Sequence, residues 1–579
     1  MKRREQSQTE QLRHALSERE AQLHEAQARL AALEGSTSLQ VGRALTAAAK
    51  RPGRGLVRLP RDLFRLWRKS GTAQQGTGRR RKAEPVRSFD AERQEARLLS
   101  GTIGDSGDRL VVAGILAPEV RAAIDPYVRV VPLRPQDAQI VFESVDVDAV
   151  LVSASATAPG TLWAHAGDPA VADRTRALNW VVEAASARGV PAILIADTPA
   201  PPALAMLGFD HVHHGDVGVP LHRFNPIAVE PERDPAPVYL PSAGPGTPVV
   251  DRLVGRLDGV RRVEPRWDSL PDVLRKAAGA VVDNPGAADR ALVCGARALL
   301  LGGSPDNGQG ALHTVAADVG TLRSGAAEAE LARMREAGAL TPEELRLALR
   351  SVFLTDATPV RLAEIFGRAS LAPGSGSASL PLKGREVALL AMPADDSVSL
   401  AFAGDVLDQE HPPAEVVVPE GAAHFAGIER LRSHGVPLRT VAGVEPTVAG
   451  PGPGDWARLA SAAAATWVAP WRAPRGSAFL ADVLCAAECS GADAVGPAVA
   501  SWRSAPSVDI DVVDQAVADQ EYVFVSAIQP DLARRELIRR GLQPGVWTRH
   551  GARLLALGSA QDAGPETSPY RARSRPNAG

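Results

Sequence analysis

The stretch Ala280–Leu301, which reads AVVDNPGAADRALVCGARALLL, decides the fold of this chain. It opens with an apolar, partly β-branched run at 280–283, continues with an alanine-rich helical segment at 287–294, and returns to leucines at 299–301. A strand, a helix and a second strand in close succession predict a parallel sheet, because parallel neighbours need a crossover of this kind. The simplest interpretation of Gly295 is a glycine cap that ends the helix.

The same rhythm extends outward from this stretch in two similar sets of elements. Strands are predicted at 110–116, 128–133, 149–153, 192–195 and 211–214, and then at 238–241, 262–265, 280–283 and 299–301. Helices are predicted at 173–187, 249–257, 270–278 and 287–294, with closing helices at 326–336, 342–353 and 359–369. Two α/β halves in tandem predict a two-lobed domain over 88–371 with a cleft between the lobes.

A third α/β region is expected at 385–558, after a Gly/Ser/Pro-rich linker at 372–384. Its strands are predicted at 387–392, 415–418, 438–441, 466–469, 522–525 and 553–557, and its helices at 397–408, 424–434, 455–465, 477–489 and 530–540. Residues 559–579 are rich in Pro, Gly and Ser and are predicted to form a disordered tail.

The N-terminal arm is basic, with 20 Lys and Arg against 8 Asp and Glu in residues 1–87. Residues 1–35 are predicted to form a coiled coil, in which an apolar seam over 9–33 joins two copies of the chain; the alternative is a single solvated helix. Residues 36–87 form a basic amphipathic segment and linker. Its 54–69 stretch alternates Arg with Leu, Phe and Trp, which suits either an anionic membrane surface or docking on the acidic remainder of the chain. No stacking platform for nucleic acid accompanies the arm.

Three cysteines, Cys294, Cys485 and Cys489, are too few for a disulfide framework. The chain has no apolar run of about 18 residues and no apolar signal core after Met1. We therefore expect a cytoplasmic protein, held peripherally at the inner face of the cell membrane if the 54–69 stretch binds lipid.

Several polar residues follow predicted strands, where parallel α/β sheets bind ligands. The loop with Ser242, Gly244 and Gly246 runs into a helix, so its backbone can approach a diphosphate, although a Gly/Pro turn needs no ligand. Asp197 and the strand residues His211 and His213 are candidates for deprotonating an acceptor hydroxyl. The two histidines share one face of the strand, but no third metal ligand is evident, and ordinary packed or exposed histidines are the alternative.

The segment 283–296, DNPGAADRALVCGA, resembles the donor-side motif of two-lobed (GT-B) glycosyltransferases, above all of the spore-protein (CgeB-like) branch. The resemblance implies a Rossmann-like pair of lobes and a nucleotide-sugar donor held by Asn284, Arg290 and Gly295. Arg290 stands where the family usually has an acidic residue on the donor ribose; a guanidinium can instead clamp phosphate. An ordinary capped helix is the competing interpretation.

The third region resembles family 2 (GT-A) glycosyltransferases over Val387–Met392, Gln409–Val418 and Gly454–Pro470. In that family the last strand leads into an Asp-rich motif that binds a divalent cation, whereas this chain continues with Trp471, Arg472, Ala473, Pro474 and Arg475. The resemblance therefore implies a degenerate domain without a metal site. The segment Gly42–Arg68 also resembles a Leu-Pro-Arg-containing stretch that precedes envelope-polysaccharide glycosyltransferase domains.

Together these resemblances imply a glycosyltransferase that moves a sugar from a nucleotide donor to a cell-envelope polysaccharide or lipid-linked acceptor and needs no cofactor. The alternative is a non-catalytic scaffold for envelope glycan assembly. A third class, nucleic-acid binding through the arm, predicts steep salt dependence for residues 1–87.

Overall fold

The computed structural model describes residues 109–227, 233–241, 247–264, 266–301, 317–319, 324–369, 377–444, 452–497, 522–525, 528–541 and 544–557, all within one compact unit that spans 88–579. The predictions for the arm (1–35 and 36–87), for the loop 242–246 and for the tail 559–579 fall outside these residues.

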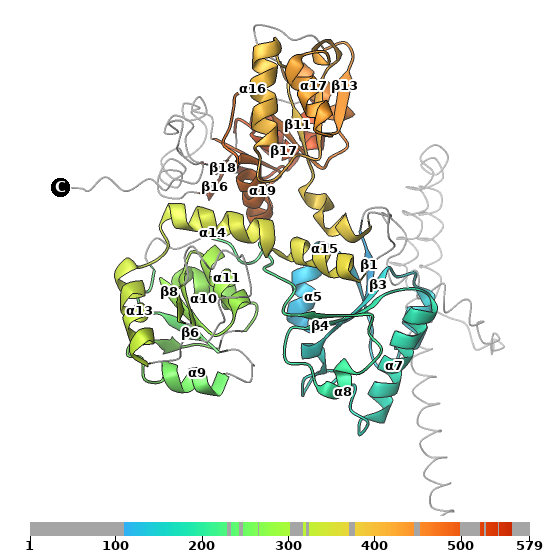
Figure 1. Cartoon of the computed structure of the whole chain (residues 1–579), viewed down its shortest axis with the longest axis vertical. Helices are drawn as coiled ribbons and strands as arrows, with labels where there is room; N and C mark the ends of the chain where they lie inside the picture. The colour runs from blue at the N-terminus through green and yellow to red at the C-terminus, as the bar shows by residue number, and fades with distance from the viewer. Residues whose placement is uncertain are drawn as a thin grey trace, which may run out of the picture. The chain divides into compact units, whose positions relative to one another are not determined.

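The first lobe is a parallel five-stranded sheet in the order β2-β1-β3-β4-β5 (Figure 1). Its elements are β1 (Val111–Ile115), α5 (Pro118–Ile124), β2 (Arg129–Pro132), α6 (Ala138–Ser144), β3 (Ala149–Ser153), the 3-10 helix η1 (Ala154–Thr157), α7 (Ala172–Ala187), β4 (Ala192–Ala196), α8 (Pro202–Ala205) and β5 (His211–His214). Alternate residues of β1 belong to different cores: Ala113 and Ile115 pack on one face, Val112 on the other. Burial on both faces explains why this sheet shows continuous apolar runs in the sequence.

The second lobe repeats this plan in the order β10-β9-β8-β6-β7, again with every pair parallel. Its elements are β6 (Val238–Leu240), α9 (Thr247–Val254), β7 (Arg261–Arg262), α10 (Leu270–Lys276), β8 (Gly279–Val282), α11 (Pro285–Val293), β9 (Arg297–Leu301), β10 (Ala317–Val319) and α13 (Ser324–Ala337). Counted along the chain, both lobes have the doubly wound strand order 2-1-3-4-5. The prediction of two similar α/β halves is therefore confirmed.

The chain passes between the lobes twice, and the two passes are hydrogen-bonded to each other. Val219 follows β5 and pairs in parallel with Ala357, which follows α14 (Pro342–Thr355). The Val219 N–H donates to the Asp356 carbonyl (2.8 Å), and the Thr358 N–H donates to the Val219 carbonyl (3.0 Å). Helix α15 (Thr358–Arg368) then packs on the first lobe through a core that includes Phe366.

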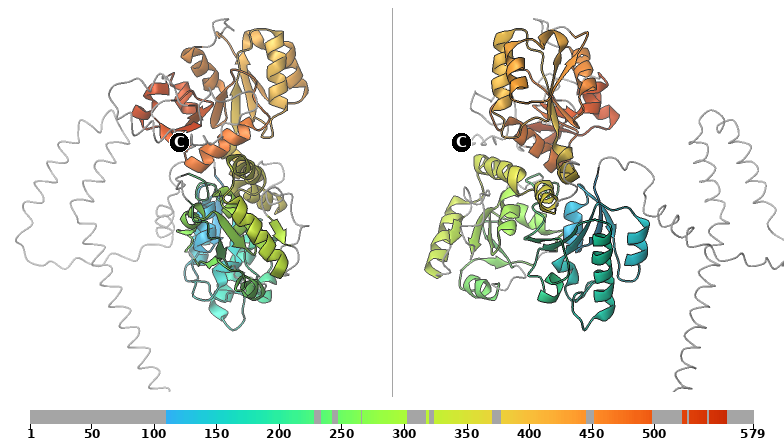
Figure 2. Two further views of the ribbon diagram at one scale, coloured as in Figure 1. Left: turned by 90° about the vertical axis from the view of Figure 1, so that its left-hand side faces the viewer. Right: turned by 45° about the vertical axis from the view of Figure 1, so that its right-hand side comes forward.

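The third region is an eight-stranded mixed sheet in the order β13-β12-β11-β14-β17-β15-β18-β16. Its elements are β11 (Val387–Leu390), α16 (Asp396–Leu407), β12 (Glu415–Pro419), η3 (Glu420–Ala422), α17 (Ala426–Ser433), β13 (Leu438–Val441), α18 (Pro453–Ala462), β14 (Trp467–Pro470), α19 (Phe479–Ser490), β15 (Ala494–Gly496), β16 (Tyr522–Val525), β17 (Leu532–Arg534), α21 (Arg535–Arg539), η5 (Pro544–His550) and β18 (Leu554–Leu557). Strands β13, β12, β11 and β14 are mutually parallel, whereas β17 runs antiparallel to both of its neighbours. Figure 2 shows helices on both faces of this sheet.

Two predictions in this region are wrong in detail. The helix expected at 530–540 begins only at Arg535, because Leu532–Arg534 form β17 and fill the space between β14 and β15. The linker expected at 372–384 is also too long, since Ser377–Arg385 form the 3-10 helix η2, which contacts α15. In both places tertiary pairing decides the structure, and the local sequence pattern does not show it.

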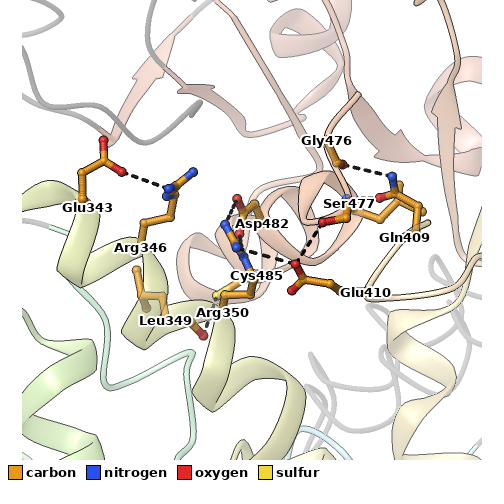
Figure 3. A network of polar contacts seen from close by, with 11 residues as sticks. Glu343, Arg346, Leu349, Arg350, Gln409, Glu410, Gly476, Ser477, Asp482 and Cys485 are labelled. Carbon is orange, nitrogen blue, oxygen red and sulfur yellow. Dashed lines mark hydrogen bonds and ion pairs between the residues drawn. The ribbon is translucent and has the colours of Figure 1, made fainter. Parts of the chain in front are cut away.

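A buried junction joins the third region to the second lobe, where α19 packs on α14. Figure 3 shows Arg350 of α14 reaching Asp482 of α19. The Arg350 Nε and Nη2 atoms donate to the two Asp482 carboxylate oxygens at 2.8 and 2.9 Å, and the Asp482 side chain is only 4% exposed. A bidentate pair of this kind fixes both distance and orientation.

A second contact of α19 reaches the first lobe. Glu488 accepts a hydrogen bond from the Tyr127 hydroxyl (2.7 Å) and another from Nε of Arg385 (2.7 Å). Burial and the Glu488 charge together hold the pKa of Tyr127 well above its usual range. Helix α19 thus holds side chains from both lobes.

Replacement of Arg350 by alanine is expected to lower the melting temperature of the full chain by several degrees. The change removes both hydrogen bonds that Arg350 donates to the buried Asp482 carboxylate, and breaking a buried ion pair of this kind costs about 3–5 kcal/mol. Arg346→Ala, one turn earlier on α14, is the matched control, because Arg346 pairs with the half-exposed Glu343 and such pairs contribute about 1 kcal/mol or less. Differential scanning calorimetry makes the comparison, and equal shifts for the two variants would contradict it.

Candidate functional site

The carboxyl ends of the strands in both lobes open onto one cleft with a volume of about 1040 Å³. Residues that follow β3, β4 and β5 of the first lobe and β6 and β8 of the second line it, together with α5, α10, α11, α15 and the residue that follows α14. The lining includes Glu119, Ser155, Asp197, His213, Asp216, Leu240, Pro241, Trp267, Asn284, Gly286, Asp289, Arg290, Asp356, Arg361 and Arg368. This edge is where doubly wound sheets bind ligands. The cleft predicted between the lobes is present.

The structure brings four of the candidate residues together in this cleft: Asp197, His213, Asn284 and Arg290. His211 lies on the same strand as His213 but does not line the cleft. Gly295 follows the C-terminal end of α11, whereas the cleft is lined by residues nearer the start of this helix. Ser242, Gly244 and Gly246 lie outside the described residues.

Asp197 and Ser155 form a polar pair on the first lobe. Asp197 follows β4 and Ser155 follows β3, so neighbouring parallel strands place them side by side. Asp197 accepts the Ser155 N–H at 3.0 Å and also binds the Ser155 hydroxyl. Burial raises the pKa of Asp197 above its ordinary value, and the hydrogen bonds from Ser155 oppose that rise. A carboxyl with a raised pKa at the edge of a cleft can act as a general base.

Two of the three histidines of β5, His211 and His213, have a pKa that their surroundings lower. Burial, and then the charge of Arg368, lower the pKa of His211; for His213 burial is also the largest cause, and Arg361 contributes. The His213 Nε2 atom lies 3.1 Å from the Asp216 carbonyl oxygen, and its buried Nδ1 has no hydrogen-bond partner. Within the part of the chain that the structure describes, no three His, Cys, Asp or Glu side chains gather as metal ligands would.

Arg290 is already engaged by its own protein. Its Nη2 atom forms an ion pair with Asp216, and its guanidinium lies over the rings of Trp267 (5.3 Å) and Phe224 (5.9 Å). The Nη2 atom belongs to both of the donor pairs that a guanidinium can offer to a phosphate. Nη2 carries two N–H groups and Asp216 occupies one of them, so the guanidinium can keep this ion pair and still offer donors to a phosphate; its buried Nε has no hydrogen-bond partner.

The start of α11 is shaped by Asn284 and Gly286. The Asn284 side chain caps the helix by accepting the Ala287 N–H at 2.8 Å. A Cβ atom on Gly286 would lie 2.4 Å from Oδ2 of Asp216, so only glycine lets that carboxylate approach the first turn. At the other end, Gly295 has φ +83° and its N–H donates to the Leu292 carbonyl, which fits the glycine-cap interpretation.

Asp289 is a site residue that the sequence analysis missed. It lies in the wall of the cleft with only 5% of its surface exposed, and its Oδ1 atom has no hydrogen-bond partner. Burial, followed by the nearby carboxylates of Asp356 and Asp216, raises the pKa of Asp289 to about 8, against the opposing charges of Arg290 and Arg361. The sequence signal that could have identified Asp289 is an acidic residue among the small apolar residues of the helix predicted at 287–294.

In the third region, the loop after β14 packs against its own domain. The Arg472 guanidinium donates to the Pro530 carbonyl (2.8 Å), and Arg475 pairs with the buried Asp531 (2.9 Å). Asp405 accepts the Trp471 indole N–H (2.7 Å) and the Arg475 N–H (2.9 Å). The cavity beside this loop has a volume of only about 10 Å³.

No family model matches the chain, and no match was found among curated proteins. A search of the described helices for a long, apolar membrane span found none.

Replacement of Asp289 by asparagine is expected to raise the melting temperature more near pH 8.5 than near pH 5.5. In the unfolded chain the carboxyl ionises around 3.8, whereas in the folded protein the pKa of Asp289 is about 8. The folded state thus keeps a proton that the unfolded state has released, and the wild type loses stability as the pH rises between those values. Asparagine does not titrate and escapes this loss.

Thermal melts across that pH range measure the effect. Asp173→Asn, which changes a carboxylate whose side chain is 93% exposed, is the control and should show no such trend. A difference between Asp289→Asn and the wild type that stays constant with pH would contradict the expectation.

Proposed function

We propose that this protein is a glycosyltransferase that binds a nucleotide sugar in the cleft between its first two lobes. One observation carries the proposal: two parallel sheets of the same strand order turn their carboxyl ends toward one cleft of about 1040 Å³. That arrangement suits a ligand with two parts, one held by each lobe. The resemblance of residues 283–296 to the GT-B donor motif supports the assignment of the donor to the second lobe.

In this proposal Asp197 deprotonates the acceptor hydroxyl, which comes from an envelope polysaccharide or a lipid-linked glycan. The raised pKa of Asp197 brings the carboxyl closer to the working pH, as a general base requires. On the donor side, the N-terminal end of α11 and the Arg290 guanidinium would stabilise the departing diphosphate, which needs no metal ion. The guanidinium can keep its ion pair with Asp216 while it does so.

The third region is proposed to be a GT-A-like domain without catalysis of its own. The engagement of Arg472 and Arg475 within that domain, and the small cavity beside them, support a structural role for this loop. The same features favour the second candidate function, a non-catalytic scaffold for glycan assembly. In either case the stretch 54–69 is proposed to bind the anionic inner face of the membrane, and 9–33 to pair two copies of the chain.

A panel of UDP, GDP, dTDP, CMP and ADP sugars tests the proposal on the full chain by thermal shift. The matching donor, at about 100 times its Kd, should stabilise the folded state by about 2.7 kcal/mol. Arg290→Ala should weaken that shift. Asp197→Asn should keep it but slow the release of nucleoside diphosphate by about 10²–10⁴-fold.

Asp148→Asn is the matched control for Asp197. Asp148 precedes β3 and accepts the Val111 N–H, so it lies at the amino ends of the strands of the same sheet, opposite the carboxyl ends where Asp197 lies. This variant should leave both donor binding and turnover unchanged. A flat response of the wild type to every donor would reject the transferase and leave the scaffold.

A further inference from the structure

The Asp197 carboxylate is held in the wall of the cleft by hydrogen bonds. Its Oδ1 atom accepts the Ser155 N–H at 3.0 Å, and its Oδ2 atom accepts the Ser155 hydroxyl. The backbone N–H groups of Asp197 and Thr198 also favour its charged form, and among the described residues no arginine, lysine or histidine is paired with it. In the same cleft, Asp216 and Asp356 are each paired with an arginine. The state of Asp197 therefore depends on its hydrogen-bond donors.

Ser155 supplies one of these donors to each carboxylate oxygen. It lies in η1, which follows β3 directly, whereas Asp197 follows the neighbouring parallel strand β4, so the pairing of the two strands brings them together. Two donors on two oxygens fix the plane of the carboxylate, and each oxygen keeps a further lone pair for another hydrogen bond. Because both residues line the cleft, a ligand hydroxyl can reach that lone pair.

Ser153 supports the Ser155 hydroxyl from the buried side. It ends β3, its side chain is buried, and its Oγ atom lies 3.4 Å from Oγ of Ser155. The Ser153 Oγ atom accepts the Ala117 N–H at 2.9 Å. This arrangement lets Ser153 donate to Ser155 while Ser155 donates to Asp197, and hydrogen bonds joined in such a chain strengthen one another.

We propose that Ser155 is a positioning residue for the Asp197 carboxylate: its N–H and its hydroxyl hold one oxygen each and so orient the base in the cleft. This role rests on the proposed function for the step that it serves, in which Asp197 takes the proton of an acceptor hydroxyl. Burial favours the uncharged carboxyl and so opposes that step. Ser155 offsets burial without a cation beside the base.

Other ionisable groups line the same cleft from neighbouring elements. They are Glu119 on α5, His213 and His214 on β5, Asp216 after β5, Asp289 and Arg290 on α11, Asp356 after α14, and Arg361 and Arg368 on α15. Within the described part of the chain, none of them is hydrogen-bonded or ion-paired to Asp197. Their titration therefore acts on Asp197 only from a distance, whereas loss of the Ser155 hydroxyl acts on it directly.

Chemical labelling tests the effect of Ser155 without any ligand. Ser155→Ala should raise the pKa of Asp197, because a hydrogen bond to the charged form is lost while burial remains. The full chain is treated with a water-soluble carbodiimide and glycine ethyl ester; the protonated carboxyl adds to the carbodiimide, and the amine displaces the urea to leave an amide. By peptide mass spectrometry near pH 7, Asp197 should be labelled several-fold more in the variant than in the wild type, relative to surface carboxyls.

The controls separate the hydroxyl from the space it fills. Ser155→Thr and Ser155→Val have nearly the same shape, so the threonine variant should label like the wild type and the valine variant like Ser155→Ala. Ser477→Ala is the matched control, because the Ser477 hydroxyl also donates to a carboxylate, that of Glu410 (3.2 Å), outside the cleft. It should leave the label on Asp197 unchanged. Equal labelling of Asp197 in the wild type and in Ser155→Ala, or in the threonine and valine variants, would overturn the inference.

Turnover tests the role in the reaction, with the nucleotide sugar that gives the largest thermal shift. In Ser155→Ala the release of nucleoside diphosphate should slow by about tenfold near pH 6, and part of this loss should disappear toward about pH 8. The reason is that Asp197 must be ionised to act as a base, and a raised pKa moves the acid limb of the pH profile upward. Donor affinity should stay unchanged, because the second lobe holds the donor in the proposed function.

The possible failures are distinguishable. A loss of rate that is the same at every pH, or a weakened donor affinity, points to a merely structural role for Ser155; it overturns the inference and leaves the proposed function standing. If no donor binds the wild type, the proposed function fails, and the step that Ser155 would serve fails with it. The labelling comparison still decides in that case whether Ser155 sets the charge state of Asp197.

Discussion

The backbone pairing of Val219 with Ala357 is the contact on which the geometry of the cleft depends. Each pass of the chain between the lobes is hydrogen-bonded to the other. The neighbouring Gly218 has φ +81°, and a Cβ atom on it would lie 2.4 Å from the Asp356 carbonyl oxygen. A side chain there would meet both backbone strain and a clash. The two passes of the chain, which together form the crossing between the lobes, therefore lie close to each other. The short segments that flank the crossing line the cleft.

Those flanking segments supply most of the charge around Asp289. Asp216 precedes one pass, Asp356 precedes the other, and Arg361 lies one turn into α15. Because the crossing and the charged wall share residues, the segments that join the lobes also fix the positions of these charges. An ionisable cluster with an unsatisfied oxygen is expensive to bury, and natural proteins tolerate such departures mainly at functional sites.

The periodic features of the fold could be predicted from the sequence, and the contacts across it could not. Strands that are buried on both faces, such as β3 and β4, appear in the sequence as apolar runs. The two lobes and their cleft could therefore be predicted from the local pattern. Strand β17 did not, because its three residues are strand only by pairing with β14 and β15. In the site, the family resemblance directed attention to Arg290 and away from Asp289, and only the tertiary structure shows that the arginine is paired while the aspartate is not.

Helix α19 is another element whose contacts the local sequence pattern does not predict. Its sequence, FLADVLCAAECS, is apolar on every face, and nearly all of its residues are buried, which is the behaviour of a helix packed all round. Its two carboxylates, the buried Asp482 and the partly buried Glu488, each pair with an arginine, Arg350 of α14 and Arg385 of η2. Since Glu488 also holds Tyr127 of the first lobe, one helix of the third region contacts groups on both sides of the crossing. The third region is thus joined through α19 to both of the lobes that line the cleft.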